Sequence, residues 1–139
     1  MTGTTTDIRR FLEEAVARNA DQPFLIWQNE TQTYEAFNSR VDAAANFWHE
    51  VGVRKGDRVS FMVDNSPDFL HAWLGLAKLG AILVAVNTGF GPTEARYLVA
   101  HSESRFALVD PCYCELFGQV QRNVQSLERT FSVGPVEGF

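Results

Sequence analysis

The sequence predicts an α/β protein with a doubly wound, mainly parallel sheet, helices on both faces and a short N-terminal hairpin. Apolar runs typical of buried strands alternate with segments of helical periodicity from residue 58 onward. Capping residues, proline and glycine stand at the ends of these segments. The 139 residues are 45% hydrophobic and 12% aromatic, which indicates one globular domain over residues 1–139.

The clearest signal runs from Arg58 to Asn87 and is typical of a strand, a helix and a second strand. Arg58–Val63 is a short run rich in β-branched and aromatic residues. Ser66 is a candidate N-cap with proline directly after it, and Gly80 stands where helices end in a left-handed conformation. Ala81–Val86 is uninterrupted apolar sequence, which predicts a parallel strand covered on both faces.

The remaining elements follow from the same signals. A first helix is expected from its cap at Asp7 to about Asn19, and Thr33 is expected to cap the second helix. Strands are predicted at 24–28 and 32–34, and they are expected to form a hairpin about Asn29-Glu30. A helix is expected to begin at Pro92 or Thr93, followed by a strand at 105–109. Asp110 is expected to cap the last helix, which precedes a strand at 129–133 and has an inner face made of Leu116, Val120, Val124 and Leu127.

Residues 76–87, LAKLGAILVAVN, resemble the second core motif of the adenylate-forming enzymes, which include acyl-CoA synthetases and the adenylation domains of peptide synthetases. TYEAF at 33–37 is similar to their first core motif, and 52–69 is similar to the segment between the two. The sequence from about Pro23 to Asp110 is most similar to ligases of the crotonobetaine/carnitine–CoA type. Ala85 stands where the family has proline, which leaves the course of the following loop open.

This resemblance implies the N-terminal portion of a larger ligase, a partial N-terminal domain of the adenylate-forming fold. Such enzymes use Mg-ATP to convert a carboxylic acid into an acyl-adenylate and pass the acyl group to coenzyme A. The family's phosphate loop and catalytic lysine have no counterpart here, so no catalytic or nucleotide-binding residue carries over. The isolated chain is expected to be inactive and to bind none of these cofactors. Its expected partners are the remainder of the parent ligase and a small carboxylic acid, with self-association through an exposed sheet edge left open.

Asn65 and Asn87 are the candidate substrate-binding residues. Each follows a predicted parallel strand, and ligands of open α/β sheets gather at the carboxyl ends of strands. Three acidic residues stand close by, but turn formation and helix capping explain Asp57, Asp64 and Asp68. Asp57 precedes its strand and so lies at the opposite sheet edge, which argues against a shared metal site.

The loop Gly89-Phe90-Gly91-Pro92-Thr93-Glu94 suggests an alternative function, a small Rossmann-like or flavodoxin-like nucleotide-binding module. It follows a predicted strand and opens a helix, as a dinucleotide fingerprint does. Glu94 replaces the third glycine, and Pro92 removes an N–H donor, so a structural loop is favoured. A docking or regulatory domain is the third alternative.

Composition and chemistry exclude several other classes. The net charge of −5, from 12 basic and 17 acidic residues, argues against a nucleic-acid partner. No apolar run approaches the roughly 20 residues of a membrane span. The N-terminus lacks the apolar stretch of a signal peptide, so the cytoplasm is the expected location. Cys112 and Cys114, with His49, His71 and His101 scattered on separate elements, do not make a metal site.

Overall fold

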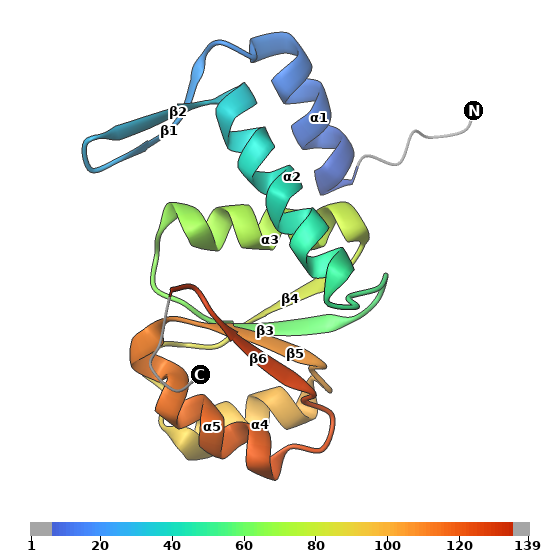
Figure 1. The fold of residues 1–139 in the computed structure, drawn as a ribbon, viewed down its shortest axis with the longest axis vertical. Helices are drawn as coiled ribbons and strands as arrows, with labels where there is room; N and C mark the ends of the chain where they lie inside the picture. Colours follow the sequence, from blue (N-terminus) through green and yellow to red (C-terminus); the bar gives the residue numbers. More distant parts are fainter. Residues whose placement is uncertain (1–6, 135–139) are drawn as a thin grey trace. The chain divides into compact units, whose positions relative to one another are not determined.

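A computed structural model describes residues 7–134 of the chain (Figure 1). Twelve elements follow one another along the described residues. They are α1 (Ile8–Asn19), β1 (Pro23–Trp27), β2 (Glu30–Thr33), α2 (Tyr34–Glu50), β3 (Arg58–Met62), α3 (Pro67–Leu79), β4 (Ile82–Ala85), α4 (Pro92–His101), β5 (Phe106–Val109), the 3₁₀ turn η1 (Pro111–Tyr113), α5 (Cys114–Asn123) and β6 (Arg129–Ser132).

These elements fall into two compact units. Unit 1 holds the described residues up to Arg54 together with Ser66–Gly80, and unit 2 holds Lys55–Asn65 together with the described residues from Ala81 onward. Helices α1, α2 and α3 and the β1–β2 hairpin therefore belong to unit 1. The four-stranded sheet, α4 and α5 belong to unit 2. A single domain over residues 1–139 stays a prediction.

The helices of unit 1 begin where their capping residues predict. The Asp7 carboxylate accepts a hydrogen bond from the Arg10 N–H at 2.8 Å, and the Thr33 hydroxyl accepts one from the Ala36 N–H at 3.1 Å. Ser66 caps α3 in the same way. Gly80 ends α3 with a φ of 74°, the left-handed conformation that glycine adopts without steric cost. These four predicted helix ends are confirmed, and so is the end of α1 at Asn19.

Helices α2 and α3 pack tightly against each other in unit 1. The buried Trp48 of α2 donates its indole N–H to the carbonyl oxygen of Ala72 on α3 at 3.1 Å. At the far end of α3, Lys78 contacts the carboxylate of Asp42 at 2.6 Å and the amide oxygen of Asn38 at 2.7 Å. Side-chain hydrogen bonds therefore join α2 and α3 at two places.

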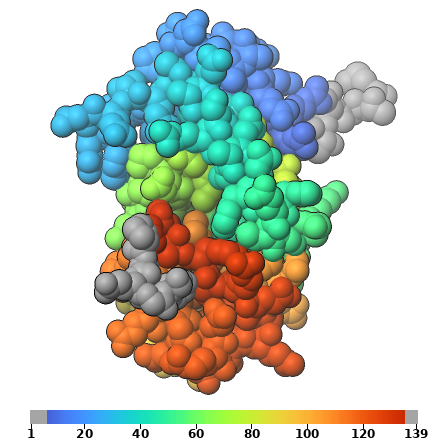
Figure 2. Space-filling model, in the orientation of Figure 1, coloured from blue at the N-terminus to red at the C-terminus, as the bar shows by residue number. Residues whose placement is uncertain are grey.

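The N-terminal hairpin exists, but its turn lies one residue earlier than predicted. β1 and β2 are antiparallel, with Trp27 opposite Glu30, so Gln28 and Asn29 form the turn. Gln28 takes the left-handed conformation, with a φ of 51°. The apolar pattern alone did not reveal this, because β2 is polar throughout. Figure 2 shows the hairpin residues, in lighter blue, at the surface of unit 1, where Ile26 is 73% exposed.

Unit 2 contains a parallel sheet in the order β4-β3-β5-β6. Ser60 of β3 pairs with Val84 of β4 on one side and Ala107 of β5 on the other. The prediction that the strands before and after α3 run side by side in the same direction is confirmed. The mixed α/β fold class, with a parallel sheet, helices and a short antiparallel hairpin, is confirmed with it.

Helices α4 and α5 cover one face of this sheet (Figure 1). Side chains from β3, β5 and both helices form one buried cluster, which is the core of unit 2. Its members are Met62, Val86, Ala95, Val99, Ala107, Val109, Cys114, Phe117, Val120, Val124 and Leu127.

The prediction that the strand after α3 is covered on both faces is wrong. β4 is the edge strand of the sheet, and Ile82 at its start is 49% exposed. Leu83 and Val84 are half-buried, and Ala85 is exposed. An apolar run indicates a strand, but its length carries no information on strand order, which long-range pairing decides.

The start of the last helix also differs from the prediction. Asp110 precedes the short η1 turn rather than capping a helix, and α5 begins only at Cys114. The inner face of α5 carries Cys114, Phe117 and Val120, whereas the predicted Leu116 is half-buried. The reason is that the Asp110 side chain has another partner, on the loop after β3. No helix among residues 7–134 combines the length and hydrophobicity required to cross a membrane.

Candidate functional site

The parallel sheet brings three loops to one edge of unit 2. β3, β4 and β5 are consecutive in the sheet order and parallel, so the segments after Met62, Ala85 and Val109 leave the sheet at the same, carboxyl-terminal edge. Both candidate substrate-binding residues, Asn65 and Asn87, lie in these segments and are exposed. This is the edge at which ligands bind in open α/β sheets.

Asn87 shapes the loop that follows β4. Its side-chain oxygen accepts a hydrogen bond from the Gly89 N–H at 2.8 Å, which is an Asx-type turn. The backbone N–H of Phe90 in turn donates to the Asn87 carbonyl oxygen at 2.9 Å. The loop that follows β4 is therefore folded back on Asn87.

A second group at this edge joins the loops after β3 and β5. The Asp64 backbone N–H donates to the Asp110 carboxylate at 2.7 Å, and the Tyr113 hydroxyl donates to the Asp64 carboxylate at 3.0 Å. Partial burial, followed by this bond to Asp64, raises the pKa of Tyr113 above its ordinary 10.0. Sequence reasoning missed Tyr113 and the pairing of the two aspartates, although both aspartates directly follow predicted strands.

The start of α4 does not suit a nucleotide phosphate. The Gly91 N–H donates to the Glu94 carboxylate at 3.1 Å, and Pro92 has no N–H to offer. A carboxylate of the chain thus occupies the helix terminus where a phosphate would bind. This contact supports the interpretation of Gly89–Glu94 as a structural loop.

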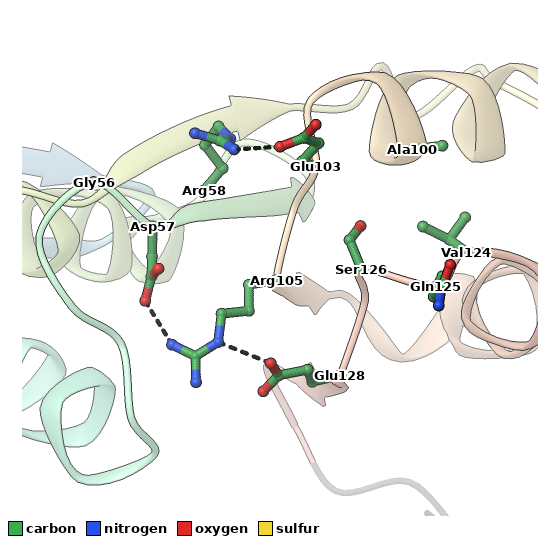
Figure 3. Close-up of a pocket in the computed structure, with 10 residues that line it drawn as sticks. All are labelled: Gly56, Asp57, Arg58, Ala100, Glu103, Arg105, Val124, Gln125, Ser126 and Glu128. Atoms are coloured by element: carbon green, nitrogen blue, oxygen red, sulfur yellow. Dashed lines mark hydrogen bonds and ion pairs between the residues drawn. The ribbon is translucent and has the colours of Figure 1, made fainter.

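A cavity of about 590 Å³ opens at the opposite, amino-terminal edge of the sheet (Figure 3). Arg105 extends between two carboxylates and contacts Asp57 at 2.8 Å and Glu128 at 3.0 Å. Arg58 contacts Glu103 at 3.2 Å and also the Ser102 carbonyl oxygen.

The charges that line this amino-terminal cavity are paired with one another. Asp57 lies there, as predicted, and its carboxylate holds Arg105. Despite its size, this cavity is a weaker candidate for the functional site than the carboxyl edge, because its charged groups already have partners and parallel sheets bind ligands at the other edge.

The cysteines contribute no metal site to the described residues. Cys112 is exposed, whereas Cys114 is buried with its thiol 3.8 Å from the Asp110 carbonyl oxygen. Across residues 7–134, no three His, Cys, Asp or Glu side chains converge in a way that could hold a metal ion.

A parallel sheet with a polar carboxyl edge, preceded in the chain by two helices and a hairpin, is an element order shared with a known family. Residues 12–136 match the family described as AMP-binding enzyme. The chain therefore belongs to the AMP-binding enzymes, the adenylate-forming class that its core motifs resemble.

The particular relatives are acyl-CoA ligases. Crotonobetaine/carnitine–CoA ligase of Proteus mirabilis (strain HI4320) is 33% identical over 85 residues, which are 61% of this chain and 16% of that protein. The ligase of the same name from Salmonella arizonae is 28% identical over 134 residues, 92% of this chain and 26% of that protein. The resemblance found in the sequence is confirmed. The chain spans about a sixth to a quarter of the length of these relatives.

Solved structures agree with this assignment. The anthranilate CoA ligase AuaEII, crystallised with anthranoyl-AMP, superimposes with a TM-score of 0.87 at 25% identity, covering 96% of this chain and 26% of AuaEII. The N-terminal domain of FACL13 from Mycobacterium tuberculosis superimposes with a TM-score of 0.85 at 21% identity, covering 93% of this chain and 34% of that domain. The latter match concerns the fold alone.

Proposed function

We propose that this chain is a portion of an ATP-dependent acid–thiol ligase, an acyl-CoA synthetase. The match of residues 12–136 to the AMP-binding family carries the proposal. A carboxylate is a poor acylating agent, whereas its mixed anhydride with AMP has a good leaving group. Mg-ATP would supply that AMP group, and coenzyme A would accept the acyl group as a thioester.

Within such a ligase, this segment contributes recognition rather than chemistry. Asn65 and Asn87 are exposed amides after adjacent parallel strands, so they can donate hydrogen bonds to a small carboxylic acid near that edge. None of the described residues matches the family's phosphate loop or its catalytic lysine. The isolated chain is therefore expected not to adenylate its acid or to bind ATP, magnesium or coenzyme A.

A pyrophosphate-release assay tests the inactivity of the isolated chain. The chain is incubated with ATP, magnesium and a set of small acids, and the full-length Proteus mirabilis ligase serves as the active control. We expect pyrophosphate from the control alone. Clear turnover by the 139-residue chain would refute the assignment of catalysis to other parts of a ligase. Saturable binding of NAD or FMN by the chain would instead favour the nucleotide-binding module.

The roles of the two asparagines are tested in a hybrid enzyme. The matched segment of the Salmonella arizonae ligase is replaced by residues 12–136 of this chain, and pyrophosphate release is measured against acid concentration. Asn65→Ala and Asn87→Ala should each raise KM for the acid at least fivefold with KM for ATP unchanged. Asn46→Ala, an exposed asparagine on α2, is the matched control. Unchanged KM values in both variants would remove these residues from the site.

A further inference from the structure

Unit 1 contains a cavity that the ligase assignment does not use. Its volume is about 540 Å³, and it lies between the turn of the β1–β2 hairpin, α2 and the first turn of α3. This volume is within the range of small-molecule sites. The lining residues that matter chemically are Trp27, Glu30, Gln32, Arg40, Asp68 and His71.

Charged side chains of both signs line this cavity. Arg40 forms no ion pair within the described part of the chain, and neither does Glu30. Asp68 lies 3.9 Å from His71 Nδ1. Desolvation lowers the pKa of His71 below 6.5, so the imidazole is neutral at pH 7 and leaves Asp68 without a charged partner. The cavity is therefore lined by one cation, Arg40, and two carboxylates, Glu30 and Asp68, none of which pairs with an opposite charge among residues 7–134 at neutral pH.

A buried histidine fixes the orientation of one polar group in this cavity. His71 is only 6% exposed, and its Nε2 lies 2.9 Å from the Gln32 side-chain oxygen. An amide oxygen can only accept, so Nε2 carries the proton and the Gln32 amide N–H groups remain available to an acceptor. The Phe37 ring packs against the imidazole at a centroid distance of 5.1 Å, which restrains the histidine further.

We propose that this cavity binds a small zwitterion. The ligand carboxylate would be held by Arg40 and the Gln32 amide, and its ammonium group by Asp68, Glu30 and the indole of Trp27. A ligand with one charge would leave the opposite set of charges unpaired, whereas a zwitterion satisfies both. The proposal concerns unit 1 alone and does not depend on the ligase function. Pyrophosphate release and zwitterion binding to this cavity are separate measurements, so either proposal can fail without the other.

Titration by amide and indole NMR tests this site. The probes are glycine betaine, acetate as the anion alone and tetramethylammonium as the cation alone. We expect glycine betaine to shift the Trp27 indole and Gln32 side-chain signals saturably, at least fivefold more tightly than either single-charge probe. The same spectra report whether the chain and each variant are folded.

Substitutions of the charged lining residues then test which of them bind the ligand. Arg40→Gln and Asp68→Asn should each weaken glycine betaine binding at least fivefold, with Glu30→Gln as a second test of the anionic side. Arg18→Gln and Asp21→Asn, exposed in unit 1 and outside the cavity lining, are the matched controls and should stay within twofold of the parent chain. Equal affinity for all three probes, or no shift of the Trp27 signal at about 100 mM glycine betaine, would overturn the proposal.

Discussion

Gly75 of α3 lies against the backbone of Ala45 on α2. A Cβ atom on Gly75 would stand 2.8 Å from the Ala45 nitrogen and 2.9 Å from the Ala44 Cβ, closer than real Cβ contacts allow. Both Gly75 and Ala45 are buried, and backbone cannot move aside as a flexible side chain can. The glycine therefore sets how closely these two helices approach.

We expect Gly75→Ala to lower the free energy of unfolding by about 1–3 kcal/mol, the range of overpacking substitutions. This loss outweighs the roughly 1 kcal/mol that alanine gains over glycine in a helix interior. Urea denaturation followed by circular dichroism measures it. Gly118→Ala on α5 is the control, since its nearest neighbour is the flexible end of Arg122 at 3.8 Å. That variant should be more stable by about 0.5–1 kcal/mol; a stabilised Gly75→Ala would contradict the close contact.

Arg105 links the starts of β3 and β6 through Asp57 and Glu128 (Figure 3). Arg105→Gln should lower the free energy of unfolding by about 1 kcal/mol, at the upper end for partly exposed pairs. The difference from the parent chain should shrink in about 1 M NaCl because salt screens the charges. Arg9→Gln breaks an exposed pair with Glu13 and should change stability by less than about 0.5 kcal/mol. Equal effects of the two substitutions would argue against a special role for Arg105.

His71 makes the stability of unit 1 depend on pH. Its folded pKa lies below the unfolded value of 6.5, chiefly because burial desolvates the charged form; Arg40 also lowers it, and Asp68 opposes the shift. The unfolded state then binds more protons near pH 6. The stability contributed by neutral His71 is therefore complete above pH 6.5 and is lost as pH falls through the folded pKa.

Stability measured between pH 7.5 and 5 tests this sign. His71→Gln should be less stable than the parent chain at neutral pH. Its free energy of unfolding should also fall less than the parent's as the pH is lowered, because the contribution of His71 is absent. The C2 proton of His71 should titrate below pH 6.5 in the NMR spectrum of the folded chain. His49→Gln, which changes an exposed histidine, is the matched control and should leave the C2 proton of His71 titrating below pH 6.5. A titration midpoint above 6.5 for His71 would contradict the burial argument.

Tyr113 makes the stability of unit 2 depend on pH in the alkaline range. Its folded pKa is raised above 10.0 by partial burial and by the hydrogen bond to Asp64, so the folded state holds the phenolic proton more tightly than the unfolded state does. The stabilisation is present below pH 10 and is lost as pH rises through the folded pKa. Tyr113→Phe should remove this alkaline loss, and Tyr97→Phe, which changes an exposed tyrosine, should not. Ultraviolet titration of tyrosinate in the two variants measures the difference directly.

Local structure was predictable wherever a few neighbouring residues set it. Ser66, Pro67 and Gly80 bound α3 at the predicted places because a cap, a fixed φ and a left-handed glycine act within one helical turn. The hairpin turn was misplaced by one residue since Gln28, rather than a typical turn residue, takes the left-handed conformation.

The candidate site was predictable only in outline. That Asn65 and Asn87 follow adjacent parallel strands came from the sequence, because strand direction and chain order place both at one edge. The hydrogen bonds that join the loops at this edge could not be predicted from the sequence. Tyr113 and Asp64 are 49 residues apart, and no local pattern indicates that a phenol will meet a carboxylate over such a separation.

By itself, the sequence determined the family, the alternation of strands and helices, and most helix ends, because short-range capping and ordered motifs encode them. Tertiary structure alone decided that β4 is an edge strand, that Arg105 joins two carboxylates, and that His71 faces Gln32 across 39 residues. The physical reason is the range of the interaction. A cap depends on neighbours three residues away, whereas strand order and buried polar pairs depend on which distant segments exclude water together.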